Sequence, residues 1–150
     1  MNANSEICEA ESSTILIVED DPTFVLVLKT ILLLLDPELT IECVDNYEQA
    51  AICIRKHSSS KSFSIISDFN LKTSSTGADV WATRCEVCPQ APFLLISTIQ
   101  NSEILSEFKP FPEAVNYLPK PSNLTVLQDE CRKLMGSSLS RDLLEYASFK

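Results

Sequence analysis

Hydrophobic residues along this chain fall into short runs separated by polar turns. Five of these runs predict β-strands, because each is four to eight residues long and is bounded by polar or turn-forming residues. They cover residues 14–18, 40–44, 63–67, 92–97 and 114–118. The first of them, TILIV, is apolar and rich in β-branched residues, as expected of a buried strand.

The segments that follow the strands predict helices. The first helix is expected to begin at Pro22, which suits a first helical turn, and to end before Asp36. Four more helices are expected over residues 46–56, 78–87, 101–108 and 122–135. The helix over 101–108 is short, because Pro110 and Pro112 cannot continue it.

This alternation of strands and helices indicates an α/β domain. Right-handed crossovers would place the strands in a parallel sheet with helices on both faces. We expect one domain over 14–135, because 150 residues of which 45% are hydrophobic suffice for a single core. Residues 1–13 are expected to be a flexible segment. Residues 136–150 form a short extension whose apolar residues follow a spacing of four, so it is a candidate for a sixth helix.

The net charge and the hydropathy of the chain limit the kinds of partner that we expect. The net charge of -9 would repel a phosphate backbone, so direct binding to nucleic acid is not expected. The amino terminus lacks the basic start and apolar middle of a signal peptide, which predicts a cytoplasmic protein. The most apolar stretch, 24–35, contains Lys29 and is shorter than the ~20 residues that span a bilayer, so no membrane insertion is expected.

The six cysteines are predicted to be reduced and structural. They are scattered through predicted strands and helices of a domain large enough to fold without disulfides. Cys85 and Cys88 form a CxxC, but no second CxxC completes a zinc site. The single histidine, His57, is expected in a solvated loop and is not interpreted as a phosphodonor.

Polar side chains stand where the predicted strands end. They are Glu19, Asp20 and Asp21 after the first strand, Asp68 after the third, Ser97 and Thr98 at the fourth, and Lys120 after the fifth. Ligands of open α/β sheets bind beyond the carboxyl ends of the strands, so we expect these residues at one edge. Neighbouring carboxylates repel one another, and a hard divalent cation relieves that repulsion. The pattern therefore predicts a Mg²⁺ or Mn²⁺ site.

Four short motifs carry a family resemblance. They are ILIVEDDP at the first strand, SDFNL at the third, LLIST at the fourth and YLPKP at the fifth. In this order and at these element ends, the chain resembles a response-regulator receiver domain of the chemotaxis type, from two-component phosphorelay systems. The resemblance implies a flavodoxin-like, doubly wound sheet of five parallel strands in the order 2-1-3-4-5, with five helices.

The resemblance also implies roles for the residues at the strand ends. Asp68 would accept a phosphoryl group from a phosphohistidine donor. Asp20, Asp68 and the backbone carbonyl of Asn70 would bind the metal directly, and Glu19 would reach it through water. Lys120 would contact a phosphoryl oxygen.

Ser97 and Tyr117 would form the switch. The resemblance implies that the Ser97 hydroxyl moves to the phosphoryl group while Tyr117 turns inward. Two plainer interpretations stay open: hydroxyls at such positions often satisfy turn amides, and Tyr117 is also acceptable as a core aromatic. The resemblance further implies a cis bond between Lys120 and Pro121, and it places Asn116 where glycine is usual, which asparagine tolerates at positive φ.

The expected function is signalling by phosphorylation, with self-catalysed phosphotransfer and autodephosphorylation as the only chemistry. The partners would be a histidine kinase or histidine phosphotransfer protein and a downstream protein target. Leu26, Leu33 and Leu34 fall off the buried face of the first helix and would form the docking surface for the phosphodonor.

Two other functions compete. A small Mg²⁺-dependent phosphatase would also use an aspartyl nucleophile, but Asn70 stands where such an enzyme has a second aspartate. A nucleotide- or flavin-binding domain would need a glycine-rich loop after the first strand, where this chain has EDDP.

Overall fold

Five parallel strands form a single sheet in the order β2-β1-β3-β4-β5 in the computed structural model, which describes residues 13–99, 101–120 and 123–138. The strands are β1 (Thr14–Val18), β2 (Thr40–Val44), β3 (Phe63–Asp68), β4 (Phe93–Ser97) and β5 (Asn116–Pro119). The predicted parallel sheet and its strand order are therefore confirmed. The flavodoxin-like arrangement follows, since helices cover both faces.

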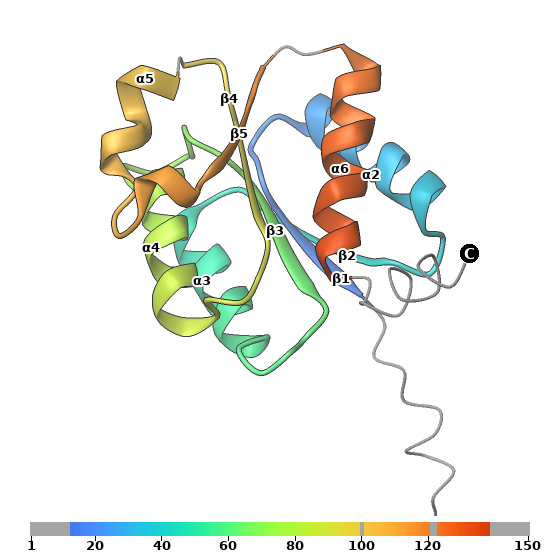
Figure 1. Cartoon of the computed structure of the whole chain (residues 1–150), viewed down its shortest axis with the longest axis horizontal. Coiled ribbons are helices and arrows are strands. Elements are labelled where there is room, and N and C mark those ends of the chain that lie inside the picture. Colours follow the sequence, from blue (N-terminus) through green and yellow to red (C-terminus); the bar gives the residue numbers. More distant parts are fainter. Residues whose placement is uncertain (1–12, 100, 121–122, 139–150) are drawn as a thin grey trace, which may run out of the picture.

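Four full helices pack on this sheet. They are α2 (Pro22–Leu35), α3 (Tyr47–Lys56), α4 (Gly77–Val87) and α6 (Leu124–Ser138). Figure 1 shows α3 and α4 on one face and α2 and α6 on the other. Asp21 begins α2 as its cap, because its carboxylate accepts a hydrogen bond from the Thr23 amide at 3.0 Å.

The prediction of a helix over 101–108, and with it of five full helices, is wrong. The segment forms one turn, α5 (Asn101–Ile104), which continues as the 3-10 turn η1 (Leu105–Glu107); a second such turn, η2 (Pro112–Ala114), precedes β5. An eight-residue helix is marginal by itself, and the carbonyls of its last turn would face Pro110 and Pro112, which have no N–H to donate. The shorter i to i+3 bonds of η1 end the segment instead.

The core consists of two apolar layers, one on each face of the sheet. Alternate residues of the central strands point to opposite faces, so Leu16 and Ile65 pack toward α3 and α4 while Ile17 and Ile66 pack toward α2 and α6. All residues of β1, β3 and β4 are buried. The carboxyl ends of these strands are therefore fixed at one edge, where the polar residues follow.

The structure tests two smaller expectations, on the cysteines and on Asn116. The cysteines of the described ranges are free thiols, as predicted. Among the described residues other than glycine, only Phe111 has a positive φ, so Asn116 does not use the left-handed conformation expected of it. The predicted cis bond to Pro121, the candidate sixth helix and most of the amino-terminal segment lie outside the described residues. None of the helices that the structure describes is long and apolar enough to cross a membrane.

Candidate functional site

The carboxyl edge brings together residues that are far apart in the sequence. Strands β1 and β3 are neighbours with Val18 opposite Ser67, so Glu19 and Asp68 leave the sheet side by side. Oxygen atoms from the carboxylates of Glu19, Asp20 and Asp68 all lie within 4.8 Å of one another. The predicted acidic cluster therefore exists, with Glu19 and Asp68 buried and Asp20 exposed.

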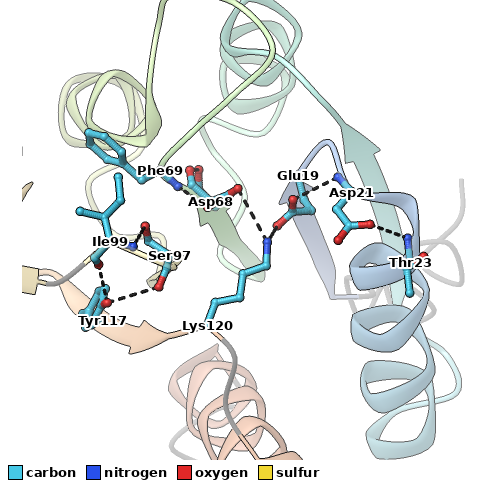
Figure 2. A network of polar contacts seen from close by, with 10 residues as sticks. Glu19, Asp21, Thr23, Asp68, Phe69, Ser97, Ile99, Tyr117 and Lys120 are labelled. Atoms are coloured by element: carbon cyan, nitrogen blue, oxygen red, sulfur yellow. Dashed lines mark hydrogen bonds and ion pairs between the residues drawn. The ribbon is translucent and has the colours of Figure 1, made fainter.

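Lys120 reaches this cluster from the end of β5. Its ammonium lies 2.8 Å from Glu19 Oε1 and 3.8 Å from Asp68 Oδ2 (Figure 2). It also lies over the ring of Phe24, 4.4 Å from the ring centroid, in a cation–π contact that the sequence did not suggest. Burial alone would lower the pKa of Lys120, but the hydrogen bond to Glu19 and the attraction of Asp68 raise it, so the ammonium stays charged.

The two buried carboxylates remain under-neutralised. Burial raises the pKa of Glu19, and repulsion from Asp68 raises it further. The hydrogen bond from Lys120 acts in the opposite direction. Burial likewise raises the pKa of Asp68, with Asp20 adding to the rise and Lys120 opposing it. Three carboxylates face one ammonium, which is the electrostatic condition that a bound cation relieves. Because the ligands that the described side chains of this cluster offer are carboxylate oxygens, the site suits Mg²⁺ or Mn²⁺.

Asp68 is held in one orientation by the backbone that follows it. The Phe69 amide donates to Asp68 Oδ1 at 2.8 Å, which leaves Oδ2 turned toward Lys120 (Figure 2). The Asn70 amide also lowers the pKa of Asp68. Asn70 itself is exposed and forms an isolated bridge with Thr76, while the role of its carbonyl as a metal ligand stays a prediction.

Gly77 shapes the site in a way that the sequence analysis missed. A Cβ at this position would lie 2.5 Å from the carbonyl oxygen of Asp68, and the Gly77 amide donates to the Phe69 carbonyl at 2.8 Å. The first turn of α4 therefore packs directly against the end of β3 because residue 77 has no side chain. The available signal was the scarcity of glycine: the chain has only 2.

Ser97 and Tyr117 lie beside the acidic cluster and form a separate set of hydrogen bonds. The Ser97 hydroxyl is buried and accepts from the Ile99 amide at 3.0 Å, so here it satisfies a turn amide. The Tyr117 hydroxyl donates to the Ile99 carbonyl at 2.6 Å and lies 3.3 Å from the Ser97 carbonyl (Figure 2). Burial raises the pKa of Tyr117, with a further contribution from Glu103. The backbone amide of Lys120 donates to the same Ser97 carbonyl at 2.8 Å, so Ser97 links the two groups.

Comparisons with known proteins agree with this fold. No protein-family model matches the sequence, and no curated protein matches it. Among solved structures, the chain resembles a response regulator receiver protein from Sinorhizobium medicae (TM-score 0.68, 20% identity, 85% of this chain and 98% of that one). It also resembles a two-component transcriptional regulator from Clostridium phytofermentans (TM-score 0.71, 19% identity, 85% and 96%).

A third similar structure is the phosphorylated cyanobacterial phytochrome response regulator RcpA (TM-score 0.65, 20% identity, 86% of this chain and 95% of that one). The chain therefore has the fold of response-regulator receiver domains. The receiver-domain assignment that the four strand-end motifs suggested is confirmed at the level of the fold.

Proposed function

We propose that this chain is a phosphoacceptor receiver of a two-component phosphorelay, phosphorylated on Asp68. One observation carries the proposal: within a receiver fold, Asp68 Oδ2 faces the Lys120 ammonium beside a three-carboxylate cluster. Phosphoryl transfer requires mainly positioning and charge neutralisation, and these residues provide both.

In the proposed reaction a carboxylate oxygen of Asp68 attacks the phosphorus of a phosphohistidine. A P–O bond forms as the P–N bond breaks, and the leaving imidazole keeps the electron pair and takes up a proton. The Phe69 amide fixes one carboxylate oxygen, so the other, nearer Lys120, is the nucleophile. Lys120 then neutralises a phosphoryl oxygen.

Asp20, Asp68, the Asn70 carbonyl and, through water, Glu19 would hold the divalent cation. When bound, Mg²⁺ or Mn²⁺ supplies charge neutralisation at the phosphoryl oxygens. A dianionic product beside Glu19 would otherwise be repelled. The acidic cluster therefore acts as a phosphoryl-binding site only in the presence of the cation.

The signal would pass through Ser97 and Tyr117. A phosphoryl group on Asp68 adds roughly -1.5 to -2 charges and new acceptor oxygens. The Ser97 hydroxyl is proposed to leave the Ile99 amide and donate to one of these oxygens. Because Tyr117 is hydrogen-bonded to the Ile99 carbonyl in the same turn, this movement weakens the contact that holds Tyr117 in place. The surface formed by α5 and β5 would then bind a downstream protein differently.

The phosphodonor is proposed to dock on α2. Leu26, Leu33 and Leu34 are 64%, 41% and 75% exposed, as the helical spacing predicted. An apolar groove of ≈ 290 Å³ runs between α2 and α6, lined by Leu26, Val27, Thr30, Ile31, Leu34, Leu124 and Gln128. A histidine kinase or histidine phosphotransfer protein bound there would lie near the acidic cluster, because α2 begins at the same edge of the sheet.

The test is intact mass after incubation with acetyl phosphate and Mg²⁺. The parent should gain one phosphoryl group and Asp68→Asn none. Asp21→Asn is the matched control, because Asn caps a helix as well as Asp and residue 21 lies outside the three-carboxylate cluster. A parent that gains no mass, or an Asp68→Asn variant that gains as much as the parent, contradicts the proposal. Sustained turnover of a simple phosphomonoester would instead support the aspartyl phosphatase.

A further inference from the structure

We propose a second metal site, formed by Glu42, Cys53 and His57, that takes a zinc-class divalent cation. Glu42 lies in β2, Cys53 lies in α3, and His57 directly follows α3. The thiol and the imidazole are four residues apart and so share one face of the helix. Ligand atoms of the three residues all lie within 4.8 Å of one another. This inference is independent of the phosphoacceptor chemistry at Asp68.

The thiol and the imidazole of the cluster both contact the Glu42 carboxylate. The Cys53 thiol donates to Glu42 Oε1 at 2.9 Å, and His57 Nε2 lies 3.1 Å from Glu42 Oε2. One sulfur, one ring nitrogen and one carboxylate are therefore close enough together to bind a single ion. A tetrahedral ion needs its ligands in such a group, with a water in the fourth position.

The surrounding packing restrains the three ligand residues before any ion binds. The His57 ring stacks on Phe63, with 4.6 Å between centroids and 15° between planes. Cys53 is buried, and the backbone of Glu42 is paired with Leu16 of β1. Because little ordering remains to be done on binding, the cluster loses less entropy than three exposed side chains would.

The ligand types select the metal. Thiolate and imidazole ligands favour zinc and its neighbours in the first transition row, whereas Mg²⁺ and Ca²⁺ prefer oxygen alone. The acidic cluster at Asp68 has the opposite preference, since it offers only oxygen. The two sites should therefore be loaded independently when both kinds of ion are present.

Lys56 would compete with a cation for Glu42. Its ammonium lies 3.1 Å from Glu42 Oε1, and its side chain is 59% exposed. On binding, the metal would replace the thiol proton of Cys53, which passes to solvent, while Lys56 swings out into water. Removing the Lys56 charge should therefore strengthen metal binding, which is not expected if the cluster serves only as a hydrogen-bonded ion pair.

The experiment is a titration of the full chain with Co²⁺, a spectroscopic substitute for zinc, in excess Mg²⁺ to fill the carboxylate site. One equivalent should produce a thiolate-to-Co²⁺ charge-transfer band that Zn²⁺ removes. Cys53→Ser should abolish the band, and His57→Asn should weaken binding at least ~10-fold. Lys56→Gln should tighten binding several-fold.

Cys85→Ser is the control, because Cys85 belongs to the CxxC and lies outside the cluster. It should bind Co²⁺ as the parent does. His57→Asn keeps the test informative if burial of Cys53 makes the serine variant unstable. The proposal is overturned if the parent shows no thiolate band, if the band depends on Cys85 rather than on Cys53 and His57, or if Lys56→Gln leaves the affinity unchanged.

Discussion

The Lys120 ammonium lies a full ångström closer to Glu19 than to Asp68, at 2.8 Å against 3.8 Å. The ammonium is hydrogen-bonded to Glu19, and it meets Asp68 in a longer ion pair. Asp68 is nevertheless buried, so its charged form is poorly stabilised. A divalent cation bound at the cluster would stabilise that charge.

Mg²⁺ should stabilise the folded protein through the carboxylate cluster. A ligand at 100 times its Kd stabilises the folded state by ~2.7 kcal/mol, which appears as a rise in Tm. Asp20→Asn removes one carboxylate ligand. The Mg²⁺ concentration needed for the same rise in Tm should therefore increase at least ~10-fold. Asp129→Asn, an exposed aspartate of α6 paired with Arg132, is the control and should respond as the parent does. Equal Mg²⁺ responses in the Asp20 and Asp129 variants would show that the cluster does not bind the ion.

Alanine at the two glycines should have opposite effects on stability. Gly77→Ala places a Cβ 2.5 Å from the Asp68 carbonyl oxygen and should cost about 1–3 kcal/mol of unfolding free energy. Gly136→Ala meets nothing within 4 Å inside α6 and should add about 0.5–1 kcal/mol, because alanine favours the helix. Urea unfolding measures both. A Gly77→Ala variant as stable as the parent would mean that α4 does not pack closely against the end of β3.

Stability at low pH should depend on Glu42. Burial opposes ionisation of this carboxyl, but hydrogen bonds from Cys53, His57 and Lys56 lower its pKa from 4.5 to about 2. A pKa depressed on folding gives stability that is complete above the unfolded value and is lost as the pH falls from 4.5 toward about 2. Glu42→Gln should therefore lower stability at neutral pH and flatten its decline in acid.

Urea unfolding over this pH range, with a metal chelator present, checks the effect. Glu86→Gln, at an exposed position of α4, is the control and should keep the parent's acid limb. An unchanged slope in Glu42→Gln would mean that the carboxyl gains nothing from its three donors on folding.

The outward leucines of α2 should matter for the protein phosphodonor alone. Leu26→Glu and Leu34→Glu place charges on the proposed docking surface and should slow transfer from a cognate phosphohistidine protein at least ~10-fold. Phosphorylation by acetyl phosphate should be unchanged, because the small donor needs no docking surface. Ile52→Glu, on α3 at a position 67% exposed, is the matched control. If the leucine variants accept phosphoryl groups from the protein donor as fast as the parent does, the donor docks elsewhere.

The positions of the site residues were predictable because strand ends are. An apolar run that stops at a charged residue fixes where that side chain leaves the sheet, so the sequence predicts Asp20, Asp68 and Lys120 at one edge, where the structure has them. The bonding of Ser97 was not decided by sequence, since one hydroxyl suits both a turn amide and a phosphoryl oxygen.

Features that depend on tertiary packing escaped the sequence analysis. His57 was expected in a solvated loop, yet its ring stacks on Phe63 and meets Glu42 from a strand 15 residues earlier. The contact of Gly77 with the Asp68 carbonyl likewise depends on how α4 approaches β3. Neither contact has a periodic signal in sequence, because each joins elements whose relative placement is set by the whole core.

The most direct test is to locate the acyl phosphate chemically. After phosphorylation with acetyl phosphate and Mg²⁺, borohydride reduces an aspartyl phosphate to homoserine, which peptide mass spectrometry assigns to a residue. We predict homoserine at position 68 and nowhere else, with none in protein that was not phosphorylated. Homoserine at position 20, or a phosphoryl group on His57 with Asp68 unmodified, would contradict the central claim that Asp68 is the phosphoacceptor.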